Sequence, residues 1–389
     1  MTEPLNRREF LGLTAAATLR AQTSPSRRPV RIGVVGGRFG ASFQWHLHPQ
    51  AQVTAVCDLR PDVLDRMAGV YRAKATYRDF REFLKHRELD AVGVFTPAPL
   101  HVWMATEAMK AGKHVISAVP AGLSVAELEE LLETVRKTGM KYMMAETSFY
   151  RPEIITCREW AREGKFGTIF YAEAEYHHEG LLGLMFDERG LPTWRHGFPP
   201  MLYPTHSTGM IVPVMRERLV EVQAVGWGDG HEILRTNQYQ NPFWHTTGFF
   251  KTSGGHSARI SVFWHVAAGG TERAQFYGDR MSYLMARPER SPNTVVEIRG
   301  RSEGDVAVEA YQQPDHMEKL PPPLRVKTGH GNSHTFLTHE FIGAIVEDRH
   351  PAVNVWEAIA YTLPGIVGHQ SALRGGEPLK IRDYGRAPV

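Results

Sequence analysis

A phenol and an imidazole stand three residues apart at Tyr203 and His206. An imidazole, with an ordinary pKa of about 6.5, can take the proton of a hydroxyl group as hydride leaves the carbon. A phenol can hydrogen-bond to the same oxygen or act as a weaker acid. Because Pro204 lies between them, we expect the pair to open a helix after a long loop and to face one cleft. The spacing predicts a catalytic pair; the alternative is that His206 is a packing residue with satisfied hydrogen bonds.

A glycine-rich segment indicates a second kind of site. It reads Gly36-Gly37-Arg38-Phe39-Gly40 and follows directly on a strand-like apolar run. Glycines permit a tight turn and let backbone amides approach a pyrophosphate at the N-terminus of a helix. The usual fingerprint is G-x-G-x-x-G, and one residue between the first two glycines is missing here. The segment still predicts dinucleotide binding through these five residues.

Asp58 supports this prediction. It stands 22 residues after Gly36, at the end of the second predicted strand. A carboxylate in that place can accept hydrogen bonds from a ribose diol, and it repels a 2′-phosphate. The sequence therefore favours NAD over NADP, while Arg60, two residues further on, keeps NADP open.

The elements around these residues alternate between strands and helices in the first 150 residues. A helix at 125–138 is indicated by apolar residues on one face, a capping box of Ser124 and Glu127, and a stop at Gly139. This alternation predicts a doubly wound parallel sheet. Strand-length apolar runs occur at 30–35, 53–57, 91–95, 114–117 and 141–145.

The rest of the chain reads differently. Strands follow one another with little helix between them, which suits a half-buried antiparallel sheet. Two helices are expected near the C-terminus, at 335–347 and 356–374. The expected strands are at 168–177, 219–226, 244–250, 258–265, 272–277 and 294–298.

The composition is that of a globular protein with two or three domains: 389 residues, 42% hydrophobic and 22% charged. The formal charge of +3 arises within the first 28 residues, which hold five arginines and two glutamates, so the remainder is neutral. No later segment concentrates Lys and Arg as a nucleic-acid-binding surface would, so no nucleic-acid partner is expected.

The basic leader has a pattern of its own. Arg7 and Arg8 precede a weakly apolar run at 10–19, and the segment resembles a twin-arginine export signal. The run has ten residues, against about 20 for a membrane span, so no stable anchor is expected. This predicts a periplasmic or otherwise exported protein that meets the twin-arginine export machinery; the alternative is a cytoplasmic protein with a basic N-terminus.

Cysteines and histidines show no metal-binding spacing. The two cysteines, Cys57 and Cys157, make no disulfide framework, and the nineteen histidines are scattered. No metal is predicted.

Two segments carry a family resemblance. Thr96-Pro97-Ala98-Pro99-Leu100-His101 and Ala111-Gly112-Lys113-His114-Val115 resemble the glucose-fructose oxidoreductase, inositol dehydrogenase and rhizopine catabolism (Gfo/Idh/MocA) family. The resemblance covers the chain after the leader at 1–28, and it implies an N-terminal Rossmann domain at 29–150 and a C-terminal α+β domain at 151–389 with an open, mainly antiparallel sheet. It also implies an active site between the domains, a homo-oligomer, and cofactor contacts from Thr96, Pro97 and His101.

One position departs from the family pattern. Most members carry Glu-Lys-Pro where this chain has Ala118-Val119-Pro120. The family lysine assists proton transfer at the reacting hydroxyl, and valine can neither donate nor accept a proton. A lysine-assisted alcohol dehydrogenase is therefore disfavoured.

Further segments resemble glycoside hydrolase family 109, namely Val119-Pro120-Ala121, residues 142–146 with Tyr150, and Tyr203-Pro204-Thr205-His206. The resemblance implies that NAD is held throughout catalysis: a sugar hydroxyl at carbon 3 is oxidised, carbon 2 loses a proton, the glycosidic bond is eliminated, water adds and hydride returns. It places Glu146 beside the cofactor and Tyr150 beside the substrate. Ala118 replaces the acidic residue of that family, and Ser207-Thr208 replace its Gly-Leu.

Other substrate contacts are expected from two segments. The long loop before Tyr203 carries Trp194, Arg195 and His196, and such groups suit the apolar face and polar edge of a pyranose. In the alternative interpretation, Trp194 anchors the loop and makes no contact with the substrate. Residues 329–334 resemble a segment that approaches the pocket in relatives, which makes His334 a candidate, although Ser333 could instead cap a helix.

Together these patterns predict an NAD-binding enzyme that acts on a carbohydrate or glycoside by hydride transfer with a tightly held cofactor. Two alternatives stay open: a conventional NAD-dependent sugar dehydrogenase, and a non-catalytic NAD- or sugar-binding module.

Overall fold

The computed structural model describes residues 28–178, 180–267, 271–286, 292–299 and 306–388. The expected export leader lies outside these ranges apart from Arg28, so it stays a prediction. Among the described residues, no helix is both long and apolar enough to cross a membrane.

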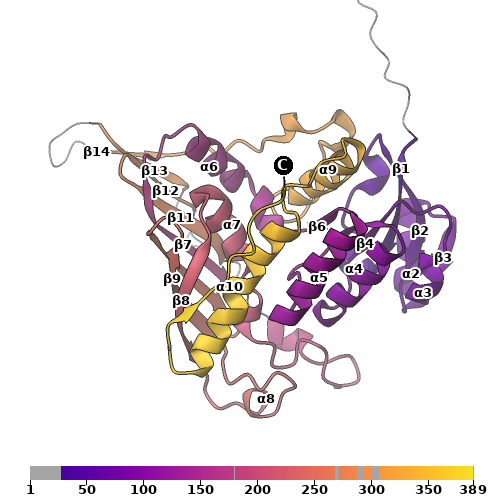
Figure 1. Ribbon diagram of the computed structural model, residues 1–389, viewed down its shortest axis with the longest axis horizontal. Helices are drawn as coiled ribbons and strands as arrows, with labels where there is room; N and C mark the ends of the chain where they lie inside the picture. Colours follow the sequence, from indigo (N-terminus) through magenta and orange to yellow (C-terminus); the bar gives the residue numbers. More distant parts are fainter. Residues whose placement is uncertain (1–27, 179, 268–270, 287–291, 300–305, 389) are drawn as a thin grey trace, which may run out of the picture.

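The first sheet is parallel and has the strand order β3-β2-β1-β4-β5-β6. Each strand expected in this region is confirmed, and β3 is an addition of only three residues, too short to show a pattern. Figure 1 shows this sheet with its helices in indigo to magenta. The strands are β1 (Val30–Val35), β2 (Ala51–Cys57), β3 (Ala75–Tyr77), β4 (Ala91–Val94), β5 (His114–Ser117) and β6 (Tyr142–Met144).

Helix α5 (Val125–Thr138) begins and ends as expected. Ser124 Oγ accepts from the N–H of Glu127 at 3.2 Å, the Glu127 carboxylate accepts from the N–H of Ser124, and Gly139 ends the helix with φ of 67°. Three more helices flank the sheet: α2 (Pro61–Tyr71), α3 (Phe80–Leu84) and α4 (His101–Lys110).

The helix expected after the glycine turn is a single turn, α1 (Gly37–Gly40). The chain leaves it at once because Phe43 and Trp45 turn inward and are fully buried, and Trp45 then begins a short 3-10 helix (Trp45–Leu47). The glycine turn therefore lacks the long helix whose dipole usually contributes to phosphate binding.

The second sheet has nine strands in the order β14-β13-β12-β11-β7-β10-β9-β8-β15. It is antiparallel except between β7 and β10, so it is mixed, and the expected strands are confirmed. The strands β12, β14 and β15 were not anticipated. Their bounds are β7 (Ile169–His177), β8 (Leu219–Trp227), β9 (His245–Thr252), β10 (Ser257–Phe263), β11 (Thr271–Gly278), β12 (Met281–Leu284), β13 (Thr294–Ile298), β14 (Val306–Ala310) and β15 (Leu379–Lys380).

One face of this sheet is covered by helices and the other is open. Ala172 and Ala174 of β7 point inward and are buried, whereas Glu173 and Glu175 point to the open face. The covering helices are α6 (Pro152–Arg162), α7 (Thr205–Met215) and α10 (Val355–Leu373), and α10 also packs against α5 of the first sheet (Figure 1). The fold class is therefore confirmed: a Rossmann-like α/β unit joined to an α+β unit with an open sheet.

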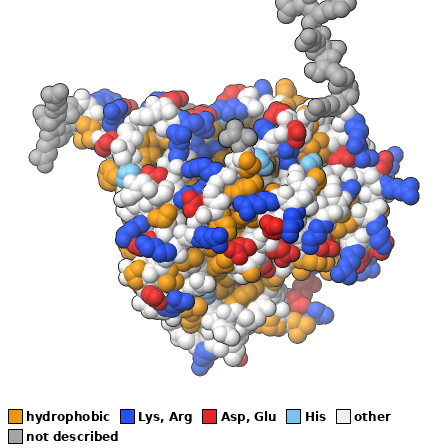
Figure 2. Space-filling model, in the orientation of Figure 1, with side chains coloured by type: hydrophobic (Ala, Val, Ile, Leu, Met, Phe, Trp, Pro, Cys, Tyr) orange, Lys and Arg blue, Asp and Glu red, His pale blue; other side chains and the backbone are white. Residues whose placement is uncertain are grey.

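The remaining elements are short or peripheral. Helix α9 (Ser333–Val346) packs beside β1, and α8 (Glu232–Arg235) lies in the loop before β9. On the face drawn in Figure 2, basic and acidic side chains are interspersed. Short 3-10 helices lie at Ala98–Leu100, Thr147–Tyr150, Leu181–Leu184, Pro200–Leu202, Met317–Lys319 and Pro322–Leu324.

Candidate active site

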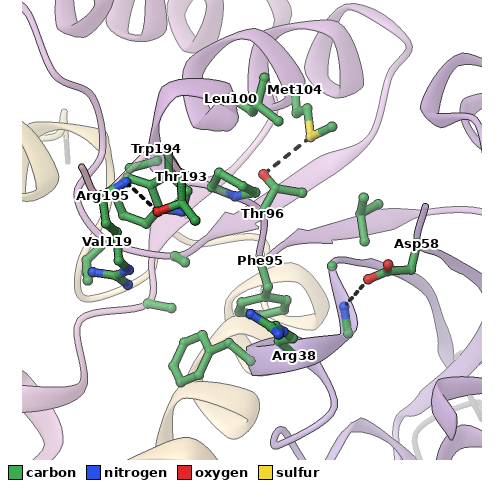
Figure 3. A pocket seen from close by; sticks show the side chains of 18 of the residues that line it. Arg38, Asp58, Phe95, Thr96, Leu100, Met104, Val119, Thr193, Trp194 and Arg195 are labelled. Atoms are coloured by element: carbon green, nitrogen blue, oxygen red, sulfur yellow. Dashed lines mark hydrogen bonds between the residues drawn. The ribbon is translucent and has the colours of Figure 1, made fainter. Parts of the chain in front are cut away.

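A cavity of about 980 Å³ lies between the two units. One side, which we call the glycine-turn wall, is formed by lining residues between 35 and 104. The opposite side, the His206 wall, is formed by lining residues between 118 and 330. Figure 3 shows Asp58 on the first wall and Thr193, Trp194 and Arg195 on the second. The volume is that of a pocket for a cofactor-sized ligand.

The glycine turn presents bare backbone to the cavity. Gly36 has φ of 87°, and a Cβ added there would lie 2.4 Å from the carbonyl oxygen of Phe95. A Cβ on Gly37 would lie 2.2 Å from Met67 Sδ. Gly36, Gly37, Arg38, Phe39, Thr96 and Pro97 all line the cavity as expected.

Gly40 does not line the cavity, which corrects its expected direct role. It lies under Phe95 and Val34, where an added Cβ would come within 2.9 Å and 3.0 Å of their side chains, respectively. Its carbonyl accepts a hydrogen bond from the Tyr71 hydroxyl. Gly40 therefore lets the turn pack closely on the sheet.

Asp58 holds the glycine turn from the end of β2. One carboxylate oxygen accepts from the N–H of Gly37 at 2.8 Å, and the other accepts from the N–H of Arg60 at 2.9 Å (Figure 3). The Arg60 guanidinium binds both carboxylate oxygens of Asp62, at 3.2 Å and 2.9 Å. Asp58 thus lines the cavity with its carboxylate bonded to two backbone N–H groups, while Arg60 is already paired with Asp62.

His101 is buried away from the cavity, which corrects its expected cofactor contact. Only 1% of its surface is exposed, and its Nε2 and Nδ1 lie 2.8 Å from the carbonyl oxygens of Thr96 and Pro120, respectively. Burial lowers the pKa of His101 against the effect of these hydrogen bonds. The side chain links the loops after β4 and β5, so it positions Thr96 rather than a ligand.

His206 lies in the first turn of α7 and is held by Glu146. Its Nδ1 is 2.8 Å from Glu146 Oε1, and that glutamate is fully buried behind the cavity wall. Gly209, one turn along, makes room, because a Cβ there would lie 2.6 Å from Glu146 Cγ. The expected cofactor contact of Glu146 is thus corrected: it orients His206, and Nε2 is left for the cavity that His206 lines.

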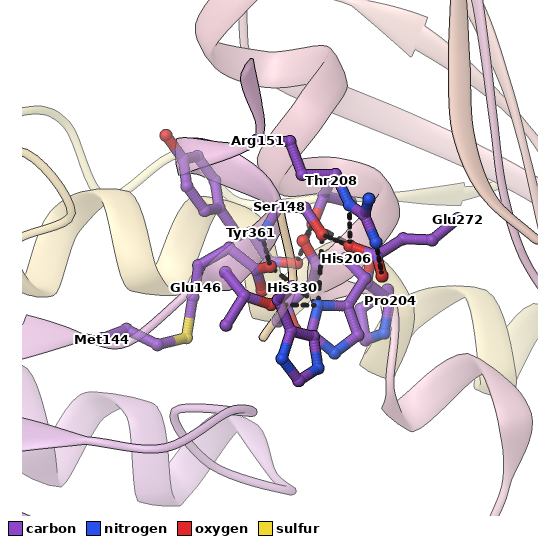
Figure 4. Close-up of polar contacts among 12 residues, drawn as sticks. Met144, Glu146, Ser148, Arg151, Pro204, His206, Thr208, Glu272, His330 and Tyr361 are labelled. Carbon is purple, nitrogen blue, oxygen red and sulfur yellow. Dashed lines mark hydrogen bonds and ion pairs between the residues drawn. The ribbon is translucent and has the colours of Figure 1, made fainter. Parts of the chain in front are cut away.

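A second buried carboxylate supports this pair. Ser148 Oγ lies 3.2 Å from His206 Nδ1 and donates to Glu272 at 2.5 Å, and Arg151 binds both oxygens of Glu272 (Figure 4). Burial opposes the ionisation of Glu272, but Arg151 outweighs it and holds the pKa of Glu272 well below its usual range. Burial also lowers the pKa of His206, but the two carboxylates outweigh it and raise that pKa above 6.5.

Two phenols flank the imidazole. Tyr203 lies just before α7 with its ring centroid 5.3 Å from that of His206, and Tyr176 of β7 lies at 4.6 Å. Burial raises the pKa of both phenols, so they act as hydrogen-bond donors rather than anions. Tyr203 and His206 are therefore brought together as expected, whereas Tyr176 was missed. Its inward place in the β7 alternation is the signal that could have found it.

The segment before α9 contributes His330 instead of His334. His330 lines the cavity, and its Nδ1 lies 3.0 Å from Nε2 of His334, which is buried and stacks on Phe43. His330, Gly331 and Asn332 all have positive φ, and this left-handed run turns His330 toward the cavity. Asn332 rather than Ser333 occupies the N-cap position, so the expected Ser333 cap is wrong.

Some of the predicted substrate-binding residues line the cavity and others do not. Trp194 and Arg195 line the cavity, while the Trp194 carbonyl accepts from the Tyr239 hydroxyl at 2.6 Å, so this residue both anchors the loop and faces the site. His196 does not line it; the ring packs against Phe186. Tyr150 is also behind the wall, where it stacks on Phe336 with centroids 5.8 Å apart. These two expected contacts are corrected, because packing turns both side chains away from the cavity.

Ala118 and Val119 face the cavity with side chains that carry no proton. Among the described residues that line the His206 wall there is no Asp or Glu, and the acidic residues of the lining, Asp58 and Asp79, are on the opposite wall. The proton-handling groups of the His206 wall are therefore imidazoles and phenols.

Comparison with known proteins agrees with this arrangement. Residues 30–146 match the oxidoreductase family with an NAD-binding Rossmann fold, Gfo/Idh/MocA. A glycosyl hydrolase family 109 protein of Solibacter usitatus is 26% identical, covering 92% of this chain and 88% of its own. One of Shewanella amazonensis is 32% identical, but the match covers 49% of this chain and 46% of that protein, less than half its length.

Solved structures share the fold. Levoglucosan dehydrogenase in complex with NADH and levoglucosan has a TM-score of 0.75 at 17% identity, covering 91% of this chain and all of its own. The apo scyllo-inositol dehydrogenase of Lactobacillus casei has a TM-score of 0.70 at 16% identity, covering 91% and 98%. Residues 30–146 therefore match the NAD-binding Rossmann domain of the Gfo/Idh/MocA oxidoreductase family, and the chain as a whole shares the fold of these dehydrogenases.

Proposed function

We propose that this protein is an NAD-dependent enzyme that acts on a carbohydrate or glycoside by hydride transfer and keeps its cofactor tightly bound. One observation carries the proposal: His206, oriented by buried Glu146, opens onto the same cavity as the bare backbone of the glycine turn. A proton acceptor and a dinucleotide cradle thus share one space.

The cradle suits a dinucleotide. Gly36 and Gly37 leave the backbone without side chains where a pyrophosphate would approach, and Arg38 lines the cavity beside them. Asp58 is placed for the ribose hydroxyls. When bound, an oxidised nicotinamide supplies the acceptor for a hydride from a substrate carbon.

NAD is favoured over NADP at this site. The Asp58 carboxylate faces the cavity and would repel a 2′-phosphate, and Arg60, the nearest cation in sequence, is already paired with Asp62. We expect the purified protein to bind NAD more tightly than NADP in a calorimetric titration. Equal affinity would contradict this preference.

The His206 wall handles the proton. With Nδ1–H donated to Glu146, Nε2 can accept the proton of a substrate hydroxyl, and the Tyr203 phenol can donate a hydrogen bond to the same oxygen. Tyr203 and His206 thus supply the proton-transfer groups that the Val119 side chain lacks. Glycoside hydrolysis by paired carboxylates is not available to the described residues of this wall, because none of them is acidic.

The proposed route is therefore redox-neutral action on a glycoside, in line with the names of the family 109 relatives. Cofactor retention is supported by the loop before α7, which contributes Leu181, Leu184 and Trp194 to the cavity. Glu188 of that loop lies 3.8 Å from Arg60 of the opposite wall. A conventional dehydrogenase that exchanges its cofactor is the second candidate, favoured by the same His206 and glycine-turn geometry.

Purified protein tests these candidates directly. Its cofactor is released and identified, and the loaded protein is given aryl glycosides and free sugars without added NAD. Released aglycone without net reduction of the cofactor supports the redox-neutral route, whereas accumulating reduced cofactor supports a dehydrogenase. No turnover across the panel would favour a non-catalytic module, and no bound dinucleotide together with no NAD affinity would overturn the proposal.

Export remains part of the proposal. Arg7 and Arg8 with the run at 10–19 support delivery by the twin-arginine route, and a retained cofactor would suit a compartment without free NAD. A reporter fused to residues 1–40 should be exported, and Arg7→Lys with Arg8→Lys should stop it. Export that persists in this double variant would contradict the twin-arginine route.

A homo-oligomer is also proposed. The open face of the second sheet exposes Val225, Trp227 and Phe249 by 50–59% of their surfaces, and no described helix covers it. Pairing of two such faces would bury these side chains. Light scattering after size-exclusion chromatography should give a multiple of 43.8 kDa, and Phe249→Glu should shift the population to monomer. A wild-type monomer would overturn this proposal.

A further inference from the structure

Arg195 lines the His206 wall, and no described carboxylate pairs with it. The described structure pairs other partly or fully buried arginines of the second unit with glutamates: Arg151 with Glu272, Arg218 with Glu357, and Arg273 with Glu175. None of the described Asp or Glu side chains forms an ion pair with Arg195. Among the described side chains, Arg195 therefore meets the cavity without a counter-charge.

The guanidinium is held in a defined orientation. It lies over the Trp194 ring, 4.3 Å from the centroid, and 6.0 Å from the centroid of Tyr203. Its hydrogen bond and charge oppose the rise that burial causes in the pKa of Tyr203. Stacking occupies one flat side of the guanidinium, so the N–H groups that do not bond to Tyr203 remain available at the edge.

Arg158 is a partly buried arginine without a carboxylate partner whose guanidinium is instead held by aromatic rings and a backbone carbonyl. Its guanidinium lies 3.6 Å from the Phe149 centroid and 5.5 Å from that of Tyr150, and Nε donates to the Ile154 carbonyl. Burial lowers the pKa of Arg158. Unlike Arg195, it does not line the cavity, so it has no access to a ligand.

The charges around the cavity favour an anion beside Arg195. The His206 wall offers no described acidic lining residue, and Glu146 and Glu272 are bonded to His206, Ser148 and Arg151 behind it. A cation at a water-poor surface is stabilised by a charge-assisted hydrogen bond from a partner of opposite sign. The ligand itself would supply this partner as a negatively charged group.

We propose that the substrate is an acidic sugar or its glycoside, whose carboxylate or sulfate group binds Arg195 while a ring hydroxyl lies against Tyr203 and His206. The proposal rests on the proposed function, because it assigns the substrate class of that same site. A carboxylate accepts two parallel N–H bonds from a guanidinium, and a sulfate group offers the same pair of oxygens. Trp194, under the guanidinium, would meet the apolar face of the sugar.

Paired ligands test this inference on the NAD-loaded protein, in which the cradle is occupied. Calorimetry compares glucose with glucuronate, galactose with galacturonate, mannose with mannuronate, and N-acetylglucosamine with its 6-sulfate. In at least one pair the acidic member should bind about tenfold to hundredfold more tightly, as a charge-assisted bond predicts. The carboxylate and sulfate pairs distinguish the two sources of charge.

Variants locate the interaction. Arg195→Gln should bring the affinities of the acidic and the neutral sugar of a pair together, with the larger loss for the acidic sugar, and Arg195→Lys should retain part of the preference. Arg189→Gln is the matched control, because Arg189 lies on the same loop, is exposed and pairs with Asp187. It should change neither affinity.

Three results would overturn the inference: equal affinities within every pair or no binding in any, a preference that survives in Arg195→Gln, and loss of bound cofactor in that variant without a change in sugar preference. The last would assign Arg195 to the cofactor. An Arg195-dependent preference without turnover would instead count against the proposed function alone, and turnover of neutral sugars without any acidic preference would count against this inference alone.

Discussion

The two walls of the cavity are built in different ways. The glycine-turn wall uses backbone at the ends of neighbouring parallel strands, and its residues lie within 35–104. The His206 wall uses side chains from a loop, a strand, a helix start and a left-handed turn, spread over 118–330. The proposed cofactor site is thus encoded in short segments, whereas the proposed proton transfer depends on residues that meet only after folding.

The walls also differ in their charged groups. The glycine-turn wall carries four arginines beside its two acidic residues, Asp58 and Asp79, whereas the described lining of the His206 wall holds one arginine, Arg195, and no Asp or Glu. The carboxylates that serve His206 lie behind it, fully buried or paired. The wall therefore presents an imidazole with a raised pKa to the ligand and keeps the negative charge away from it.

The largest expected effect comes from removing the imidazole. His206→Ala should reduce turnover by about 100- to 10,000-fold, because a positioned general base is lost. Cofactor content should stay unchanged, since His206 belongs to the opposite wall. Turnover and released NAD are measured on the same preparation. His265→Asn is the control, because His265 is exposed and lies outside the cavity lining.

If turnover persists in His206→Ala, the proton acceptor is another residue of this wall. A variant that loses both turnover and cofactor would break the proposed separation of the walls.

The complementary change fills the glycine turn. Gly36→Val places a side chain where the Cβ alone would lie 2.4 Å from the Phe95 carbonyl, at φ of 87°. We expect loss of bound NAD and a free energy of unfolding lower by about 1–3 kcal/mol or more. Cofactor analysis and urea unfolding measure both effects. Gly69→Ala, at a glycine with open space around it, is the control. Retained NAD would contradict the role of the turn.

The Glu146 carboxylate should set the pH dependence. It raises the pKa of His206, and the base must be neutral, so kcat/KM for hydroxyl oxidation should rise with pH through that raised value. Glu146→Gln should move this midpoint to lower pH and reduce turnover by about tenfold to hundredfold. A pH profile of both proteins measures the shift. An unchanged midpoint would show that Glu146 is structural only.

The same coupling has a stability consequence. Because the folded pKa of His206 is raised, its contribution to stability is fully present below pH 6.5, the ordinary value, and is lost as the pH rises through the raised pKa. The free energy of unfolding should therefore fall most in Glu146→Gln when it is measured below pH 6.5.

The smallest expected effect is on the free energy of unfolding and comes from the N-terminal cap of helix α5. Ser124→Ala removes the cap of α5 and should lower the free energy of unfolding by about 1 kcal/mol, with no change in turnover or cofactor content. Urea unfolding with an activity assay measures this. A change in turnover would show that the two units are coupled more tightly than their separate walls suggest.

Local patterns predicted much of the fold. Strand β1 and helix α5 occupy the expected residues, because apolar runs and capping boxes depend on near neighbours in the chain. The length of α1 was not predictable in this way, since burial of Phe43 and Trp45 ends the helix after one turn. The strands β3 and β12 were missed because neither contains an uninterrupted apolar run, whereas the equally short β6 lies in one.

The site was less predictable than the fold. Tyr203 and His206 were identified from residue type, spacing and the resemblance to glycoside hydrolase family 109, but Glu146, His101, Tyr150, His196 and His334 lie behind the wall. Their residue types suit a pocket, and only packing decides which side of the wall each occupies. Tyr176, His330 and Glu272 reach the site from positions far apart in the chain, so no local spacing in the sequence identifies them.

The sequence by itself determined the glycine turn, the acid at the end of β2, and the proton-free side chain at Val119, since each follows from residue type at a local position. Tertiary structure decided that Glu146 holds His206, that Glu272 and Arg151 support the pair, and that Arg195 faces the cavity without a counter-charge from any described side chain. The physical reason is range: backbone conformation is set by neighbours in the chain, whereas charge pairing and exposure are set by whatever else folds into the same space.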